Sequence, residues 1–515
     1  MSKTIDRTTK PAPVTAVRAS VPLRYRAALF GVAGVVVAAW GSWVPSLWGD
    51  EVTSLMSAER PLPSLFAMLR HVDAVHGTYY FGLHWWVAVF GPSPFSIRFP
   101  SAIAVGLMVA AVVVVATRVG SARLGVIAGV VCLLLPRVTY MGEEARSFAF
   151  SAAIVAWLTV ILLELLRRES APVWLWIAYG ALLAVGIYVF LYVALFVLVH
   201  AVTLVAVRAP RHLLVRWATT AGIAAAITLP LVVFAVLERK QISYLASHDQ
   251  LSPDTVFSSL WFGAPWFAAA AWALIVVAMV DVVRMRVRRA EAGVRPPFFE
   301  TTRTPSLVLV ASVWLFLPTL VLVLGSAAIP AFTARYVSFC APAAALLIAC
   351  GIEVLARGRR WVDAVALVAL AALAAPIYFE QRTPYAKNDS DWAVISSVIG
   401  SHAVAGDAVV FDEGAHPSKK PRMAMHAYPA GFVNTRDVTL DVPYTANNGW
   451  ADRAYSVAHA ASLGRFDGIR RVWLLEYVNG GKADTYGTGD LERLGFEERG
   501  AVIHTHRGLI VEFTR

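Results

Sequence analysis

The sequence predicts a polytopic α-helical membrane protein with about 11 transmembrane helices, interfacial helices in the first outer loop and a small C-terminal α/β domain. Composition supports this fold class, because 58% of the 515 residues are hydrophobic and only 15% are charged. The mean hydropathy of +0.62 implies more apolar surface than a soluble domain can bury. After about residue 379 the charge density rises and the apolar runs become short.

Apolar runs long enough to cross a bilayer recur from residue 28 to residue 378. A spanning helix needs roughly 20 mostly apolar residues, and about eleven runs meet that requirement. The first run lacks a small-residue cleavage site, so we expect it to be retained as a span rather than removed as a signal peptide. The predicted spans are centred on 28–47, 99–117, 124–140, 148–166, 172–189, 191–207, 216–236, 264–283, 306–327, 337–356 and 361–378.

Basic residues predict the side of the membrane on which each loop lies, because Lys and Arg accumulate in cytoplasmic loops. If the basic tail before the first span is cytoplasmic, every later basic cluster also lies inside. The net charge of +11 therefore indicates topology and not nucleic-acid binding. The later clusters are Arg118 with Arg123, Arg167 with Arg168, and the stretches 208–217, 284–295 and 357–360.

The stretch TYYFGLHWWVAVFG at 78–91 is predicted to be a helix that lies on the outer face of the membrane. Its 14 residues are too few for a span, and its aromatic residues are typical of an interface. A span here would also turn every later basic loop outward. The polar loops at 71–80, 136–148, 238–254 and 328–339 are consequently expected outside.

The C-terminal tail alternates short β-rich runs with helical runs, which predicts an α/β domain outside the membrane. No G-x-G-x-x-G or P-loop motif supports a nucleotide site. The three cysteines lie in apolar runs and are interpreted as buried small residues, not as disulfides or metal ligands. The β-rich runs are 407–413, 470–478 and 501–515, and the helical runs are 391–403, 452–466 and 490–496.

An acidic pair follows the first predicted span, in the stretch SLWGDEVTSL. A carboxylate near the bilayer surface is costly unless it is solvated, paired or used. Asp50 and Glu51 are flanked by Trp43 and Trp48, and a helix end would hold Asp50 rigidly enough to act as a general base. We interpret Asp50 as functional.

A second polar cluster, GEEARSF, precedes the predicted span 148–166. The helix dipole accounts for Glu143 and Glu144 at a helix start, but it disfavours Arg146 there. An arginine in this place indicates a partner anion, either a carboxylate or a phosphate.

A third cluster, ARYV, begins a late span with Arg335 and Tyr336. A single arginine at this level can reach lipid headgroups. Together with Arg239 and Lys240 in the preceding outer loop, however, these residues predict a site for a lipid-linked phosphate.

These motifs, in this order, resemble the GT-C superfamily of membrane glycosyltransferases, of the protein-mannosyltransferase and aminoarabinose-transferase type (family 39-like). Within it they are most similar to actinobacterial mannosyl- and arabinosyltransferases that use polyprenyl-phosphate sugars. The resemblance covers roughly residues 25–350 and the start of the tail. It is carried by GDE, by H-x-x-YY with LHWW and SIRFPSA, by PRVTYMGEEARSFAF, by ARYV and by DWAVISSVIGSHAVAGDAVVF.

The resemblance implies a GT-C fold and an inverting transfer of a sugar, mannose first, from a polyprenyl-phosphate donor. The acceptor is a cell-envelope glycan, lipoglycan or protein, and the other expected partner is membrane lipid. It implies a cytoplasmic tail 1–27, a catalytic transmembrane domain 28–378 and an extracytoplasmic domain 379–515 in the plasma membrane. The implied residues are Asp50 as base with Glu51 beside it, Arg146, Arg335, Tyr336 and Lys240 at the donor phosphate, and Asp73, His76, Tyr79, Glu143 and Glu144 at the substrate.

Two features of the family pattern stay open. Some relatives use a divalent metal, for which Asp50, Glu143 or His76 would supply ligands, yet the sequence has no compact metal motif. In many relatives a double proline opens the interfacial helix, whereas HGTYY stands here, which leaves the role of His76 and the local loop shape open.

Alternative functions are also compatible with parts of the sequence. An arabinosyltransferase differs only in its sugar pocket. A transporter or flippase would place ionisable residues or broken helices near the bilayer midplane. A structural protein whose tail binds wall polymer would leave Asp50, Arg146 and Arg335 without a role.

Overall fold

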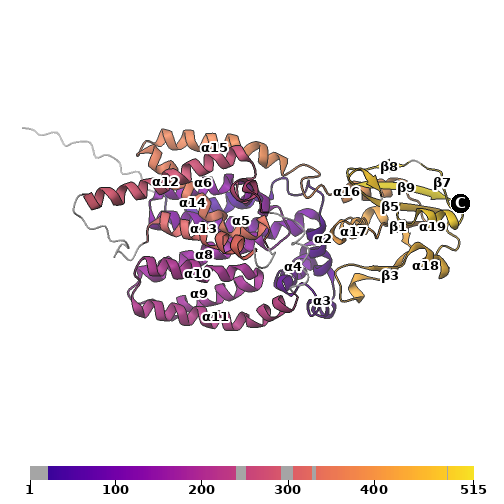
Figure 1. Cartoon of the computed structure of the whole chain (residues 1–515), viewed down its shortest axis with the longest axis horizontal. Coiled ribbons are helices and arrows are strands. Elements are labelled where there is room, and N and C mark those ends of the chain that lie inside the picture. The colour runs from indigo at the N-terminus through magenta and orange to yellow at the C-terminus, as the bar shows by residue number, and fades with distance from the viewer. Residues whose placement is uncertain (1–20, 239–250, 292–304, 327–331, 484, 501) are drawn as a thin grey trace, which may run out of the picture.

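The computed structural model confirms the predicted fold class: a bundle of apolar helices carries a separate α/β domain at one end (Figure 1). Three short helices, α2 to α4, lie between these two parts (Figure 1). The structure describes residues 21–238, 251–291, 305–326, 332–483, 485–500 and 502–515.

Every predicted span contains a helix, although not every helix is long. In the described ranges seven helices are long and apolar enough to cross a membrane, or eight if α6 and α7, bent by 63°, form one span. The other three predicted spans fall on α1, α9 and α10, which are shorter. The bundle helices are α1 (Leu23–Ala39), α5 (Pro94–Val119), α6 (Ala122–Leu134), α7 (Pro136–Gly142), α8 (Phe148–Arg167), α9 (Val173–Val189), α10 (Leu195–Ala206), α11 (Arg211–Leu237), α12 (Pro265–Glu291), α13 (Leu307–Ser326), α14 (Ala341–Ala356) and α15 (Arg360–Glu380).

The first span ends earlier than predicted. It was expected to reach residue 47, but α1 stops at Ala39 and the chain turns at Gly41, whose φ is +74°. Glycine adopts this left-handed conformation without strain, and Pro45 disfavours a helix across the residues before it. The acidic pair therefore opens a new helix, α2 (Gly49–Glu59), and does not follow the span directly.

The segment between α1 and α5 is mostly helical and forms one side of the site. We call residues 40–93 the outer segment. The predicted interfacial helix at 78–91 is present as a helix of 14 residues. The elements of the outer segment are α2 (Gly49–Glu59), α3 (Leu62–Leu69), the 3-10 turn η1 (Ala74–His76) and α4 (Gly77–Phe90).

The tail domain is an α/β domain, as predicted, with strand order β2-β1-β5-β9-β7 in its main sheet. β1 runs parallel to both β2 and β5, while β5 and β9 are antiparallel. Each predicted β-rich run contains a strand of this sheet. The bounds are α16 (Trp392–His402), β1 (Asp407–Phe411), α17 (Arg422–Ala427), β2 (Thr435–Asp437), β5 (Arg471–Asn479), α19 (Thr488–Arg493), β7 (Glu497–Glu498), β8 (Ile503–His504) and β9 (Gly508–Thr514), with a hairpin of β3 (Leu440–Val442) and β4 (Arg453–Ala454) and the short α18 (Val457–Ser462) beside it.

The outer segment and the tail domain share one hydrophobic core. Buried Leu47 and Val52 belong to the same apolar cluster as Phe411 and Trp473 of the tail sheet. The helical bundle and the far side of the sheet have cores of their own. Burial of apolar surface between two segments stabilises their contact, so the tail domain is fixed onto the outer segment.

The remote end of the bundle carries the basic loops that were predicted to share one side. Arg123 forms a bidentate ion pair with Asp363, and Arg118 pairs with Glu164. These contacts bring three predicted cytoplasmic loops together. The cysteines are buried and free, as expected.

Candidate active site

Asp50 lies in the first turn of α2, with its carboxylate between two arginines. Oδ2 of Asp50 is 2.5 Å from NH1 of Arg335 and 3.9 Å from NH2 of Arg146. Oδ1 accepts no hydrogen bond from the residues that the structure describes. The side chain is 21% exposed, so one oxygen is anchored while the other stays accessible.

The arginines keep Asp50 ionised. Burial alone raises the pKa of this carboxyl, but the charges of Arg335 and Arg146, with the Arg335 hydrogen bond, outweigh it, and the pKa lies below its ordinary value of 3.8. Asp50 is thus a carboxylate at any physiological pH.

Arg146 is buried and fixed by uncharged partners as well as by Asp50. It donates to Oγ of Ser54 at 3.2 Å, and its NH2 lies 3.3 Å from Nε2 of His76. Burial, together with the charge of Arg146, lowers the pKa of His76 to about 4. The imidazole is therefore neutral and can accept this hydrogen bond.

Glu51 points away from Asp50 into a buried ion pair with Arg98. The two side chains are both fully buried, and two hydrogen bonds of 2.7 and 2.6 Å join them. Arg98 also donates to the carbonyls of Ser42 and Pro45, and the amide of Ala145 donates to Oε1 of Glu51. Glu51 thereby fixes the start of α2 against α5 and against the residue before Arg146.

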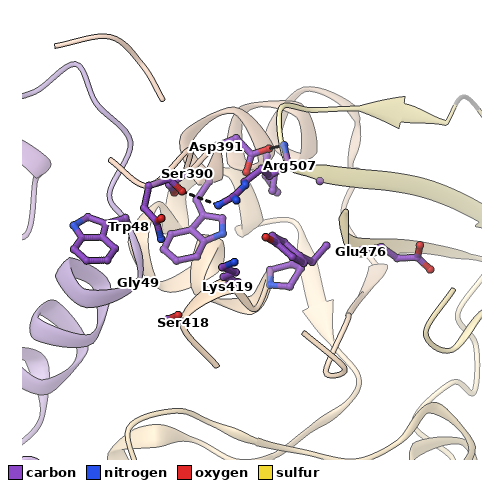
Figure 2. Close-up of a pocket in the computed structure, with 14 residues that line it drawn as sticks. Trp48, Gly49, Ser390, Asp391, Ser418, Lys419, Glu476 and Arg507 are labelled. Atoms are coloured by element: carbon purple, nitrogen blue, oxygen red, sulfur yellow. Dashed lines mark hydrogen bonds between the residues drawn. The ribbon is translucent and has the colours of Figure 1, made fainter. Parts of the chain in front are cut away.

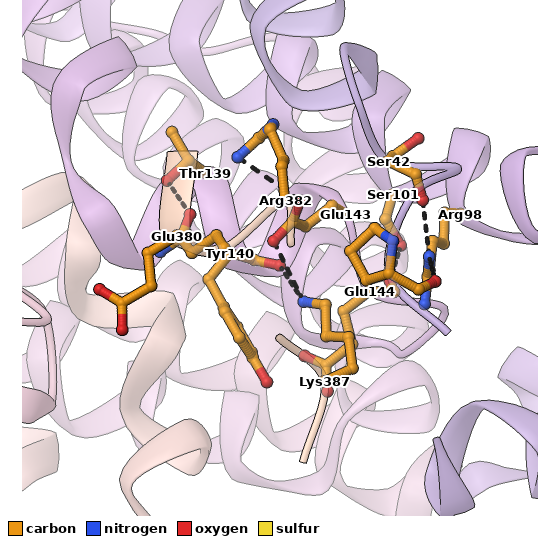
Figure 3. Close-up of polar contacts among 12 residues, drawn as sticks. Ser42, Arg98, Ser101, Thr139, Tyr140, Glu143, Glu144, Glu380, Arg382 and Lys387 are labelled. Carbon is orange, nitrogen blue, oxygen red and sulfur yellow. Dashed lines mark hydrogen bonds and ion pairs between the residues drawn. The ribbon is translucent and has the colours of Figure 1, made fainter. Parts of the chain in front are cut away.

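Glu143 forms ion pairs with two cations from the chain that follows α15 (Figure 3). Its carboxylate oxygens lie 3.4 Å from NH1 of Arg382 and 3.4 Å from Nζ of Lys387. Burial raises the pKa of Glu143 and lowers that of Lys387, and each charge opposes the shift of the other. The Lys387 ammonium also lies 3.4 Å from the centre of the Tyr140 ring.

Glu144 differs from its neighbour, because it faces a cavity. It is 1% exposed, and its Oε1 has no hydrogen-bond partner among the described residues. Burial raises the pKa of this carboxyl against the opposing charges of Lys387 and Arg335. Of the two glutamates, only Glu144 has a free oxygen toward an open space.

This cavity, of about 490 Å³, is the larger of two hollows near Asp50. Arg335, the partner of Asp50, and Arg137 are its two cations. The volume lies within the range of small-molecule sites. The lining residues are Trp48, Pro136, Arg137, Tyr140, Glu144, Ser259, Gly263, Thr333, Ala334, Arg335, Gln381 and Asn388.

Arg137 was not predicted as a site residue. It donates to the carbonyls of Leu260 and Ser259 at 2.6 and 2.8 Å, and the described part of the chain gives it no carboxylate partner. The sequence interpretation placed it where the span 124–140 overlaps the outer loop 136–148 and gave it no role. Pro136, which breaks that span, is the feature that could have located Arg137 at a bend.

The other predicted residues lie around this centre or outside the described chain. Oδ2 of Asp73 accepts hydrogen bonds from Tyr80 and, in the tail domain, from Trp450. Tyr79 is buried against the ring of Phe150. Tyr336 packs on Tyr192 in an aromatic cluster beside the cavity. Lys240, like Arg239, lies outside the described residues.

The donor set around Asp50 does not fit a divalent cation. No group of three His, Cys, Asp or Glu side chains in the described ranges is arranged to hold a metal. Asp50 is paired with two arginines, and Glu143 is paired with an arginine and a lysine, so neither carboxylate is free to bind a metal. We derive no step through a metal.

Solved structures share this architecture at low sequence identity. ArnT from Cupriavidus metallidurans in the apo state matches with a TM-score of 0.54 and 13% identity, over 95% of this chain and 98% of that chain. The structure of the same protein bound to undecaprenyl phosphate matches equally well, over 94% and 97%. Arabinofuranosyltransferase AftD from Mycobacteria matches with a TM-score of 0.56 and 14% identity, over 96% of this chain but 40% of that one.

These likenesses show a GT-C-like fold and confirm that part of the sequence prediction. No family model matches the chain. No curated protein matches it either.

Proposed function

We propose that the chain is an inverting glycosyltransferase that moves a sugar from a polyprenyl-phosphate donor to a hydroxyl of a cell-envelope acceptor. The observation that carries this proposal is the pairing of Asp50 with Arg335, which lines the 490 Å³ cavity. A fixed carboxylate and a cation that lines an adjoining cavity are the two groups that displacement of a phosphate by a hydroxyl needs. The shared fold with ArnT, one structure of which holds undecaprenyl phosphate, supports the donor class.

In the proposed reaction the acceptor oxygen attacks the anomeric carbon from the face opposite the phosphate. The bond between that carbon and the phosphate oxygen breaks with its electron pair on the phosphate, and the anomeric configuration inverts. The hydroxyl proton passes to Oδ1 of Asp50, the oxygen that no arginine holds. The leaving group is polyprenyl phosphate.

Arg335 and Arg137 balance the charge of the departing phosphate in this scheme. Both line the cavity and are partly buried, and a guanidinium held away from bulk water stabilises developing negative charge more strongly than a solvated one. Arg146 lies behind Asp50 and acts as a positioning residue. The unpaired oxygen of Glu144 supports a role in accepting a hydrogen bond from a hydroxyl of the donor sugar.

We propose mannose as the sugar, with arabinose as the second candidate. The similarity in fold to the arabinofuranosyltransferase AftD is the reason to test arabinose as well. We also propose that the chain lies in the cytoplasmic membrane with its N-terminus inside, because the basic loops gather at the end of the bundle remote from the site. The site and the tail domain would then be extracytoplasmic.

The test is sugar transfer from synthetic polyprenyl-phosphate-mannose and polyprenyl-phosphate-arabinose by membranes that contain the chain. We expect transfer from one donor by the wild type and a loss of about 100-fold or more in Asp50→Asn, since a general base contributes that much. Asp467→Asn, an exposed aspartate of the tail domain, is the matched control and should retain full activity. Wild-type membranes inert with both donors would contradict the proposed function, and an active Asp50→Asn would contradict the choice of base.

A further inference from the structure

A second, smaller pocket lies where the outer segment meets the tail domain (Figure 2). Trp48 and Gly49 line it from the outer segment, Asn388 from the linker after α15, and Lys419, Tyr477 and Arg507 from the tail domain. Its volume of about 20 Å³ holds one oxygen-sized group. The pocket is at the end of β5 that follows its parallel pairing with β1, the edge at which open α/β sheets bind ligands.

Trp48 and Asn388 form a wall common to this pocket and the 490 Å³ cavity, because both residues line both hollows. The guanidinium of Arg335 lies 5.3 Å from the centre of the Trp48 ring. Gly49, which also lines the small pocket, precedes Asp50 directly. The small pocket therefore reaches the residue next to Asp50, and Trp48 and Asn388 are shared between it and the 490 Å³ cavity.

Both wall residues have polar groups without partners. The indole Nε1 of Trp48 is buried and has no hydrogen-bond partner in the described part of the chain. The side chain of Asn388 is exposed, and its amide makes no hydrogen bond with any described residue, so it is open to a ligand. Buried polar groups are normally satisfied, so the unpaired N–H of Trp48 indicates a ligand atom at this wall.

The backbone around Asn388 is held in place on both sides. Asn388 and Asp389 are both left-handed, with φ of +52° and +54°, a conformation that asparagine and aspartate tolerate better than other side chains. Before them Lys387 is paired with Glu143, and after them Ser390 donates to the carbonyl of Leu47 at 2.6 Å. The Asn388 carbonyl accepts from Arg507 at 2.8 Å. Left-handed residues fixed in this way are typical of functional sites.

We infer that Trp48 and Asn388 form the acceptor subsite and that its ligand is a sugar hydroxyl of a glycan acceptor. This inference rests on the proposed function. The Trp48 N–H and the Asn388 amide bind the incoming hydroxyl and an adjacent one, and the pocket admits one such group while the rest of the glycan lies along the seam with the tail domain. The linker between the last span and the tail domain is then part of the acceptor site.

The experiment separates acceptor recognition from donor chemistry. Octyl α-mannoside and octyl α-arabinofuranoside serve as acceptor probes, and hydrolysis of the polyprenyl-phosphate sugar by water reports the donor half alone. Asn388→Gly removes the amide but keeps the left-handed backbone, and Trp48→Phe keeps a ring but removes the N–H. Asn434→Ala, an exposed asparagine of the tail domain, is the matched control.

We expect Asn388→Gly to raise the KM for the acceptor probe about tenfold, as for the loss of one hydrogen-bonding group of about 1.4 kcal/mol. The ratio of transfer to hydrolysis should fall with it, and Trp48→Phe should show the same direction. Asn434→Ala should match the wild type in both rates.

Three results would overturn the inference. Wild-type acceptor KM and transfer ratio in both variants would do so while the proposed function stands. An equal loss of hydrolysis and transfer in Asn388→Gly would assign the residue to the donor. Donor hydrolysis by the wild type without transfer to either probe would place the acceptor outside the glycan class. A wild type that neither hydrolyses nor transfers either sugar would instead overturn the proposed function itself.

Discussion

At the residue scale, the two adjacent carboxylates of α2 have opposite environments. Consecutive residues of a helix point about 100° apart, so Asp50 faces Arg335 and Arg146 while Glu51 enters the fully buried pair with Arg98. The sequence predicted that the acidic pair is functional. It could not separate the two roles, because α2 was not expected as a helix and Arg98 is 47 residues away in the chain.

The ionisation of Asp50 depends on Arg335, which leads to a prediction for the pH dependence. In the wild type the acid limb of kcat/KM should lie below 3.8, the ordinary aspartate value. Arg335→Gln removes the cation and leaves the burial, which raises the pKa. Asp50 then takes up a proton at higher pH, and the acid limb should move upward.

Transfer rates measured between about pH 4 and pH 7 test this shift. Arg499→Gln, an exposed arginine of the tail domain, serves as control. An acid limb that stays in place in Arg335→Gln would mean that another group limits the rate.

His76 should make the protein less stable in mild acid. The pKa of His76 is about 4 in the folded protein and 6.5 in the unfolded chain. The unfolded chain therefore binds the proton first as the pH falls. Stability is therefore lost from about pH 6.5 downward, by about 2 kcal/mol at pH 5. The midpoint of thermal unfolding should fall less between pH 7 and pH 5 in His76→Gln than in the wild type.

Exposed His504→Gln provides the comparison, and its thermal midpoint should follow that of the wild type. Equal declines in the wild type and in His76→Gln would show that the imidazole titrates normally.

At the scale of elements, the start of α2 depends on close contact with the tail domain. A Cβ on Gly49 would lie 2.4 Å from the carbonyl oxygen of Ser418, a distance that real atoms do not adopt. Gly49→Ala should therefore push α2 away from the tail edge and reduce sugar transfer strongly. Transfer, together with the protease sensitivity of the tail domain, measures this separation.

Gly82→Ala is the matched control, since a Cβ at Gly82 in α4 meets nothing within 4 Å. This change should keep full activity and gain up to about 1 kcal/mol of helix propensity. An active, protease-resistant Gly49→Ala would show that the contact at Ser418 yields without effect on the site.

Element boundaries were the least predictable part of the fold. Hydropathy located every bundle helix, because apolar runs of this length are stable only as helices in the bilayer. It could not show that Gly41 would end α1 early or that the bend at Pro136 would turn Arg137 toward the cavity, since both outcomes depend on packing between distant segments.

At the scale of the whole molecule, buried charges join the bundle to the tail domain. Lys387 and Glu143 are both fully buried and paired. Removing one partner of such a pair leaves a buried charge, at a cost of about 3–5 kcal/mol, whereas removing both costs far less. Lys387→Met should lower the thermal midpoint sharply, and Lys387→Met with Glu143→Gln should recover much of the loss.

Thermal unfolding of both single variants and the double variant measures this coupling. Effects that simply add would indicate that the two side chains do not interact. Arg382, the second cation at Glu143, limits the recovery in the double variant.

The sequence predicted a membrane bundle and an α/β tail, but not their interdependence. Composition and periodicity indicate the secondary structure of each segment and whether it lies in the membrane. The shared core of Val52 and Trp473, and the wall formed by Trp48 and Asn388, join residues hundreds of positions apart, and no local pattern encodes such pairs.

That shared core has a consequence for biosynthesis. A ribosome makes Asp50 hundreds of residues before Lys387, Ser418 and the tail strands. A nascent chain therefore carries the proposed base before the surroundings that orient it exist. On the proposed function, the protein can use lipid-linked sugar only after the tail domain has been made and has folded onto the outer segment.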